Sequence, residues 1–224
     1  MTPSTQPKPQ RPGAAGIALP PRPVIFAIDA WLWLRELSGQ YGRRVSLADV
    51  PDEAWDSVGA PDAVWLMGVW ERSPAGRAIA MSHPGLRGTF DEALPGWTPD
   101  DVESSPYCVR RYVVDAALGG AEGLAVARAE LARRGIGLIL DYVPNHVAPD
   151  HPWVAAHPAY FIHGTPDDLA AAPDAFFAAG DQILALGREP NAPPWPDVVQ
   201  LNAFNPGLRA ATIATLIAIA DQCD

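Results

Sequence analysis

The sequence predicts an α/β fold with parallel strands, and three observations support this. Short apolar runs recur at residues 24–28, 63–69 and 136–140, and each predicts a buried strand. Helical patterns lie between these runs and at the end of the sequence. The run at 136–140 is apolar on both faces, which is typical of parallel strands covered by helices. A doubly wound sheet and a (β/α)₈ barrel both fit this order of elements.

Taken in order, the elements alternate with long irregular stretches. The first 23 residues contain seven prolines and are expected to form a disordered lead-in. Residues 49–58 predict a helix with Pro51 near its start. Between residues 71 and 107 no period is sustained among the many Gly, Pro and Ser residues, which predicts functional or poorly ordered loops.

The second half begins with the clearest helix, at residues 121–134, which Gly135 ends before the third strand. Residues 142–206 hold eleven prolines and are predicted to be loop-like, and residues 207–220 predict a helix that is apolar on nearly every side. A barrel needs eight strands and roughly 250 residues. With three convincing strands, the sequence is expected to be cut short.

The composition disfavours several classes of protein. The sequence has 224 residues, 48% of them hydrophobic, yet no apolar run approaches the roughly 18 to 20 residues of a membrane span. Its formal net charge of −10, with no basic stripe, disfavours nucleic-acid binding. Two cysteines provide no disulfide framework, and the N-terminus has no signal-peptide pattern. A cytoplasmic location is therefore expected.

Chemically capable residues follow the third predicted strand. Asp141 comes directly after it, and Asn145 and His146 follow within six residues. In α/β folds, function gathers at the carboxyl ends of parallel strands, so these side chains are candidates for a site. The alternative is that Asp141 only accepts hydrogen bonds from its own loop and that His146 is a surface residue.

Other residue patterns give weaker signals. Four histidines recur without the helical i, i+4 spacing of zinc hydrolases, namely His146, His151, His157 and His163. Tryptophans in the predicted loops, which are Trp97, Trp153 and Trp195, can stack on sugar rings or anchor their loops. The sequence contains neither a phosphate-binding loop after a strand nor a Gly-x-Ser-x-Gly elbow.

The segment from Asp141 to His146 resembles the first conserved region of the α-amylase superfamily, glycoside hydrolase family 13, whose pattern is Asp-x-x-x-Asn-His. Ser105-Pro106-Tyr107 is similar to the segment after the second barrel strand of that family. Gln200-Leu201-Asn202 is similar to its short conserved region before the fourth strand, and residues 65–70 resemble the second strand of bacterial members. The resemblance covers about residues 24–224.

The resemblance implies roles for four residues. Tyr107 would stack on the sugar at the cleavage subsite, and His146 would hydrogen-bond the hydroxyls of that sugar. Asp141 would help to hold the catalytic strands in place. Asn145 matches the position that often ligates a structural calcium ion through its amide oxygen. No organic cofactor is implied.

The resemblance also implies a domain organisation, that of a partial (β/α)₈ barrel truncated before its fourth strand. Residues 24–146 would form the first three β/α units, and residues 147–200 a domain B-like excursion. Residues 201–224 would form the helix that leads to the absent fourth strand. The implied function is hydrolysis or transglycosylation of α-glucosidic bonds, in an α-glucan or a small α-glucoside, by retaining double displacement.

The resemblance assigns no catalytic residue to this sequence. The family's nucleophile is an Asp in an Arg-x-Asp pattern on the fourth strand, and its acid/base is a Glu on the fifth. Neither motif is present, so residues 1–224 alone are expected to be inactive. The alternatives are a non-catalytic carbohydrate-binding or scaffold protein, which the loop tryptophans suggest, and an unrelated doubly wound domain.

Overall fold

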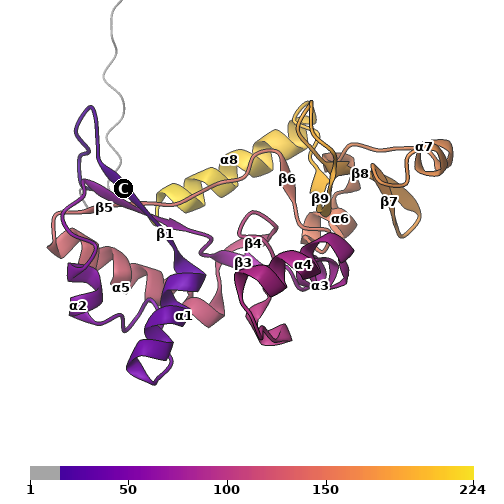
Figure 1. The fold of residues 1–224 in the computed structure, drawn as a ribbon. Coiled ribbons are helices and arrows are strands. Elements are labelled where there is room, and N and C mark those ends of the chain that lie inside the picture. Colours follow the sequence, from indigo (N-terminus) through magenta and orange to yellow (C-terminus); the bar gives the residue numbers. More distant parts are fainter. Residues whose placement is uncertain (1–15) are drawn as a thin grey trace, which may run out of the picture.

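A computed structural model describes residues 16–224 and has a parallel sheet at its centre. Strands β1 (Ile25–Asp29), β2 (Ala63–Met67) and β5 (Gly137–Ile139) pair in the order β1-β2-β5, all in parallel (Figure 1). The three predicted strands and the α/β class are therefore confirmed. The expected disordered lead-in lies mostly outside the described residues, and residues 16–23 form no helix or strand.

Three helices pack with this sheet: α1 (Ala30–Tyr41), α2 (Asp52–Asp56) and α5 (Gly120–Arg133). The helix α5 matches the prediction, and Gly135 leaves it with a φ of 75°. The predicted helix at 49–58 is shorter because Pro51 lies at its N-cap, in extended backbone. The helix α1 was not predicted. It begins directly after β1 because the Asp29 carboxylate accepts a hydrogen bond from the Leu32 N–H (3.0 Å).

The prediction of irregular loops between residues 71 and 107 is wrong. This region and its flank contain β3 (Trp70–Arg72), α3 (Pro74–Ser82), α4 (Pro84–Ala93), η1 (Pro99–Asp101), β4 (Val109–Val114) and η2 (Ala116–Leu118). Pro74 and Pro84 occupy first-turn positions, where the missing N–H of proline costs nothing. Ser73 caps α3 by accepting a hydrogen bond from the Gly76 N–H at 2.8 Å.

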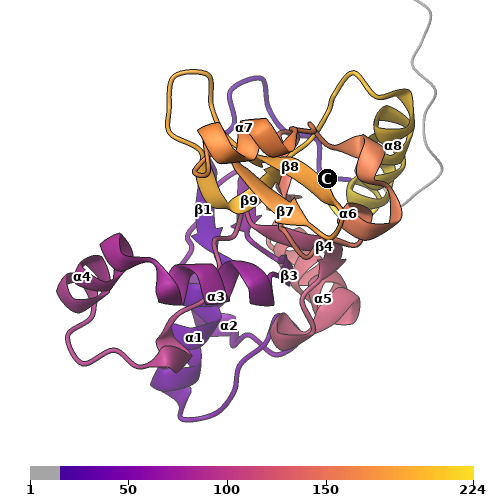
Figure 2. The same ribbon diagram turned by 90° about the vertical axis from the view of Figure 1, so that its right-hand side faces the viewer.

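The prediction of a loop-like segment at residues 142–206 is also wrong. The elements are β6 (His146–Val147), α6 (Pro152–Ala156), η3 (Pro158–Tyr160), α7 (Pro166–Ala171), β7 (Phe176–Ala179), β8 (Gln182–Gly187) and β9 (Trp195–Gln200). The strands form an antiparallel sheet in the order β6-β9-β8-β7 (Figure 2). Again the prolines begin helices instead of breaking structure.

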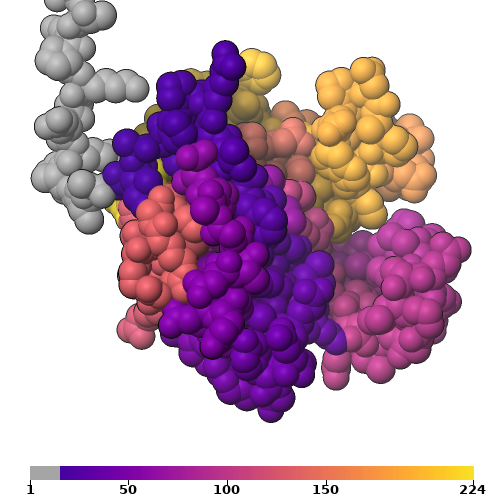
Figure 3. All heavy atoms as spheres, turned by 60° about the vertical axis from the view of Figure 1, so that its left-hand side comes forward, coloured from indigo at the N-terminus to yellow at the C-terminus, as the bar shows by residue number. Residues whose placement is uncertain are grey.

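The hydrophobic core consists of two separate clusters, one at each sheet. A large cluster that includes Trp55, Trp70 and Leu66 lies between the parallel sheet and its helices. A separate cluster around Phe161 and Leu184 lies under the antiparallel sheet. In Figure 3 the segment with α4 and the segment with β8 and β9 form two lobes on the same side of the molecule. The predicted domain boundaries remain a prediction.

The last helix, α8 (Pro206–Ala220), returns the chain from the antiparallel sheet to the parallel sheet (Figure 1). The backbone N–H of Asp224 then donates to the carbonyl of Leu138 in β5 (2.9 Å), and the Leu138 N–H donates to the Asp224 carboxylate (2.9 Å). Among residues 16–224, no helix combines the length and the hydropathy that crossing a membrane requires.

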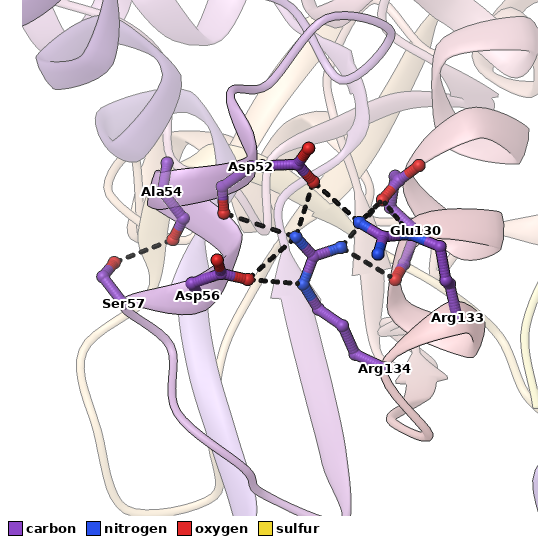
Figure 4. A network of polar contacts seen from close by, with 7 residues as sticks. All are labelled: Asp52, Ala54, Asp56, Ser57, Glu130, Arg133 and Arg134. Atoms are coloured by element: carbon purple, nitrogen blue, oxygen red, sulfur yellow. Dashed lines mark hydrogen bonds and ion pairs between the residues drawn. The ribbon is translucent and has the colours of Figure 1, made fainter.

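An ion-pair network fastens α2 to the end of α5 (Figure 4). The Arg134 guanidinium donates to the carboxylates of Asp52 (2.7 Å), Asp56 (2.9 Å) and Glu130 (2.7 Å). Arg133 contacts the same Asp52 oxygen and Glu130, but its side chain is 58% exposed against 12% for Arg134. Exposed pairs contribute little, so Arg134 is the residue of this network that matters for stability.

Replacing Arg134 by Met should lower the melting temperature by about 2 to 4 °C, whereas Arg133→Met should change it by less than about 1 °C. The first variant leaves three carboxylates without their shared partner, and the second removes an exposed pair. Thermal unfolding followed by circular dichroism measures both. Equal shifts for the two variants would contradict this explanation of the network.

Candidate active site

The site lies where the three parallel strands end. Because they are parallel and in register, Asp29 of β1, Met67 of β2 and the Asp141 that follows β5 come to one edge of the sheet. The sequence predicted this position for Asp141. Asp29, which also caps α1, was not predicted as a site residue, since no motif surrounds it in the sequence.

Asp141 connects β5 to the ends of the neighbouring strands. One carboxylate oxygen accepts a long hydrogen bond from the Gly68 N–H (3.4 Å), and its backbone carbonyl accepts one from the Trp70 indole (2.9 Å). The other oxygen, Oδ2, is buried and makes no hydrogen bond of ordinary geometry among the described residues, although the Trp65 side chain lies near enough to lower the pKa of this carboxyl. Burial raises the pKa of Asp141, although the Gly68 N–H and the Arg72 guanidinium oppose the rise.

Tyr107 lies against the end of β2, on a turn that Gly68 makes possible. Gly68 has a φ of 71°, and a Cβ there would lie 2.7 Å from the Pro106 side chain, so only glycine fits. The Tyr107 hydroxyl contacts the Met67 sulfur (2.9 Å), and the residue is 38% exposed. Partial burial raises the pKa of Tyr107, and so do the nearby carboxylates of Asp141 and Asp29.

His146 is buried and its ring is oriented by a chain of hydrogen bonds. The Arg188 backbone N–H, which can only donate, bonds to Gln200 Oε1 (3.1 Å). The Gln200 amide nitrogen therefore donates to Asn145 Oδ1 (2.9 Å), and Asn145 Nδ2 faces His146 Nδ1 (3.1 Å). Nδ1 must then be the acceptor, so the neutral imidazole carries its proton on Nε2.

The protonation state of His146 follows from its surroundings. Burial lowers the pKa of His146, while the Asp197 carboxylate and the Tyr107 backbone carbonyl raise it. Because burial is the largest effect, the imidazole is neutral at pH 7. The edge of its ring also packs on the Trp195 indole, with 5.4 Å between ring centroids.

Tyr107 and His146 line one cavity of about 580 Å³, the central cleft of the site. Its other wall comes from the hairpin of β8 and β9, which contributes Glu189, Trp195 and Asp197. The Cys108 thiol donates to the Asp197 carbonyl (3.0 Å) and so fixes this wall to the start of β4. Asp141 does not line the cleft. Its contacts with Gly68 and Trp70 instead connect the end of β5 to the residues that follow β2.

The sequence analysis did not identify Arg72, which lies near the cleft, nor Glu189 and Asp197, the two acidic residues that line it. The Arg72 guanidinium bonds to the Ser104 carbonyl (2.6 Å), and burial lowers its pKa. Four carboxylates oppose that effect, those of Asp29, Glu103, Asp115 and Asp141. Arg72 belongs to β3, and Glu189 and Asp197 belong to the β8–β9 hairpin. Both elements fall in regions that the sequence predicted to be loops, so no sequence signal identified these three residues. Trp195 was recognised only as one of several loop tryptophans.

The side-chain amide of Asn145 takes part in the hydrogen bonds around His146. Its amide oxygen accepts the Gln200 hydrogen bond, and the amide group orients His146. Within residues 16–224 no three His, Cys, Asp or Glu side chains are grouped so that they could hold a metal ion. Calcium ligands also include amide and backbone oxygens, so the calcium role of Asn145 stays a prediction.

Comparison with known proteins identifies the fold. No protein-family model and no curated protein matches the sequence. Among solved structures, an α-amylase from Lactobacillus plantarum is 17% identical and aligns over 90% of this chain with a TM-score of 0.51. MutB, a trehalulose synthase, aligns over 89% with TM-scores of 0.54 for an inactive mutant with isomaltulose (16% identity) and 0.53 for a mutant with sucrose (17% identity).

These similarities establish the fold of α-amylase-type catalytic domains for this chain, as the sequence resemblance predicted. The chain spans 37% of the L. plantarum enzyme and 33% of MutB, about a third of their lengths. The cleft of this chain lies at the carboxyl edge of its parallel sheet.

The raised pKa of Asp141 predicts a pH-dependent effect of Asp141→Asn. A folded-state pKa above the unfolded value means that the charged carboxylate destabilises the folded chain at neutral pH, and that protonation removes this penalty as the pH falls. The neutral Asn variant should therefore be more stable than the wild type at pH 7, with a smaller advantage at pH 4. Urea unfolding measures both, with the exposed Asp181→Asn as control. An Asn variant that is less stable than the wild type at pH 7 and equally stable at pH 4 would contradict the burial argument.

The hydrogen-bond chain predicts that Gln200→Glu changes the tautomer of His146. A carboxylate accepts but does not donate, so Asn145 loses the bond that orients its amide. The ¹⁵N NMR spectrum of wild-type His146 should show a protonated Nε2, and the variant should show a mixture with protonated Nδ1. The exposed Gln40→Glu is the matched control. An unchanged His146 spectrum in the Gln200 variant would disprove the chain.

Proposed function

We propose that this chain is the N-terminal portion of the (β/α)₈ catalytic domain of a glycoside hydrolase family 13 enzyme that acts on α-glucosidic bonds with retention. One observation carries the proposal: on an α-amylase-type fold, Tyr107 and His146 face one cavity at the carboxyl edge of the parallel sheet. The sequence motifs that contain these residues resemble the family in the same order along the chain.

In this proposal the cleft residues bind and orient one sugar ring. The exposed face of Tyr107 offers an apolar surface that suits the C–H groups of a pyranose. The Nε2–H of the neutral His146 faces the Tyr107 backbone carbonyl in the free chain, and a bound sugar hydroxyl would compete with that carbonyl for this hydrogen bond. Trp195 and Asp197 close the opposite side and provide a second ring and a hydrogen-bond acceptor.

The charge of the cleft favours an uncharged substrate. Glu189 and Asp197 are among the residues that line it, and that lining contains no Lys or Arg. Sugar phosphates and uronic acids would meet two carboxylates without a counter-charge. Neutral α-glucosides fit, and the MutB structures with isomaltulose and sucrose support this class of substrate.

Cleavage with retention requires two carboxyl groups about 5 to 5.5 Å apart, a nucleophile and an acid/base. The sequence lacks the Arg-x-Asp motif that supplies the nucleophile in this family. We therefore propose that residues 1–224 by themselves bind sugar without cleaving it. The same cleft also supports the second candidate function, a carbohydrate-binding protein without catalysis, because Tyr107, His146 and Trp195 need no carboxylate pair to bind sugar.

Isothermal titration of the 224-residue chain with maltose tests the proposal. Replacing His146 by Ala should weaken binding about tenfold, since a buried hydrogen-bond donor to the sugar is lost. The exposed His163→Ala should leave the affinity unchanged. Incubation of the same chain with maltooligosaccharides should release no product. Equal affinity in the His146 variant and the wild type would refute the proposed cleft, and turnover would refute the proposed lack of cleavage.

A further inference from the structure

A second cavity, of about 400 Å³, lies between β4, the start of α6 and the second half of α8, and we call it the β4–α8 cavity. Figure 2 shows α6 beside α8. No residue that lines the cleft of Tyr107 and His146 also lines the β4–α8 cavity, so the two are separate. Its volume lies within the range of small-molecule sites, roughly 300 to 1,000 Å³.

His151 brings a buried hydrogen-bond donor to this cavity. Its side chain is 6% exposed, and its Nδ1 accepts a hydrogen bond from the Trp153 backbone N–H (3.0 Å), which caps α6. Burial lowers the pKa of His151 to about 4, although the Asp150 carboxylate opposes the fall, so the ring is neutral at pH 7. The proton of the neutral ring is therefore on Nε2.

The Nε2–H of His151 has no hydrogen-bond partner among residues 16–224. Because Nδ1 faces its own helix, Nε2 lies on the far side of the ring, toward the cavity that His151 lines. A buried donor without a partner is unfavourable, and an acceptor on a bound ligand would satisfy it. Asn, Asp or Ser would cap the helix without this cost.

Arg111 provides the charge of the β4–α8 cavity. Its Nε donates to the Glu71 carboxylate, which Arg110 shares, and its two terminal amino groups have no partner in the described part of the chain. No Asp or Glu is among the residues that line the cavity, whereas Glu189 and Asp197 line the cleft. The free donors of a guanidinium suit a carboxylate, which accepts two parallel hydrogen bonds.

The rest of the lining is largely apolar. Ala214 and Ala218 lie one turn apart on α8, opposite the Trp153 ring. The Tyr112 hydroxyl is already used by the backbone of Val143, through its carbonyl (3.2 Å) and its N–H (3.0 Å). The Trp153 ring is held against the His151 ring, with 4.6 Å between centroids. A ligand would therefore meet a preordered aromatic face and methyl groups.

We propose that the β4–α8 cavity binds a small carboxylic acid with a flat apolar body. Its carboxylate accepts hydrogen bonds from the terminal amino groups of Arg111 and from the Nε2–H of His151, and its body lies between Trp153 and the alanines of α8. The inference goes beyond the proposed function, because no residue of the cleft takes part in it.

Titration of the 224-residue chain with benzoate at pH 7, followed by NMR, tests the inference, with benzamide as the uncharged probe of the same shape. The wild type should bind benzoate at least about tenfold more tightly than benzamide, because the bonds to a carboxylate are charge-assisted. Arg111→Met should abolish this preference. His151→Asn keeps an oxygen that caps α6 but lacks the Nε2–H, and should weaken benzoate binding about tenfold.

Two further variants keep the test independent of these contacts. Ala214→Trp changes an exposed residue, fills the cavity and should abolish benzoate binding. Arg87→Met removes an exposed arginine of α4 outside the cavity and should leave the affinity unchanged. The inference is overturned if the wild type does not bind benzoate, if it binds benzoate and benzamide equally, or if the Ala214 variant binds benzoate as the wild type does.

Discussion

The site depends on the side chain of Gln200, which joins the antiparallel sheet to the end of the parallel sheet. Its amide accepts a hydrogen bond from the Arg188 backbone N–H and donates to the backbone carbonyl and the side-chain oxygen of Asn145, with a longer contact to the Leu201 carbonyl (3.4 Å). Because a backbone N–H can only donate, the direction of every later bond is fixed, up to His146. The pairing of β6 with β9 therefore orients the imidazole as well as closing one side of the cleft.

The carboxyl edge of the parallel sheet contains buried polar atoms whose hydrogen bonds are not satisfied. Asp141 and Arg72 each hold a buried polar atom without a hydrogen-bond partner among the described residues. Such groups destabilise a fold unless a ligand or a function uses them. Both lie near Gly68, at the carboxyl edge of the sheet that carries the cleft. These groups therefore reduce the folding stability contributed by the region where binding is proposed. The burial of the large hydrophobic core around Trp55 and Trp70 offsets this loss.

The sequence predicted what depends on local patterns. Continuous apolar runs identified the three parallel strands, and the position of Asp141 after the third strand indicated the edge that carries the site. The helix α1 was missed because Trp31-Leu32-Trp33 continues the apolar run of β1 with Asp29 as the single polar residue between them. Glu189 and Asp197 reach the cleft through the register of a hairpin, 43 and 51 residues beyond His146, and no local pattern encodes that distance.

A crystal structure of the chain with maltohexaose tests the central claim most directly. We expect one pyranose ring against Tyr107, with a hydroxyl within hydrogen-bond distance of His146 Nε2. A sugar bound elsewhere on the surface, with the cleft of Tyr107 and His146 empty, would contradict the account.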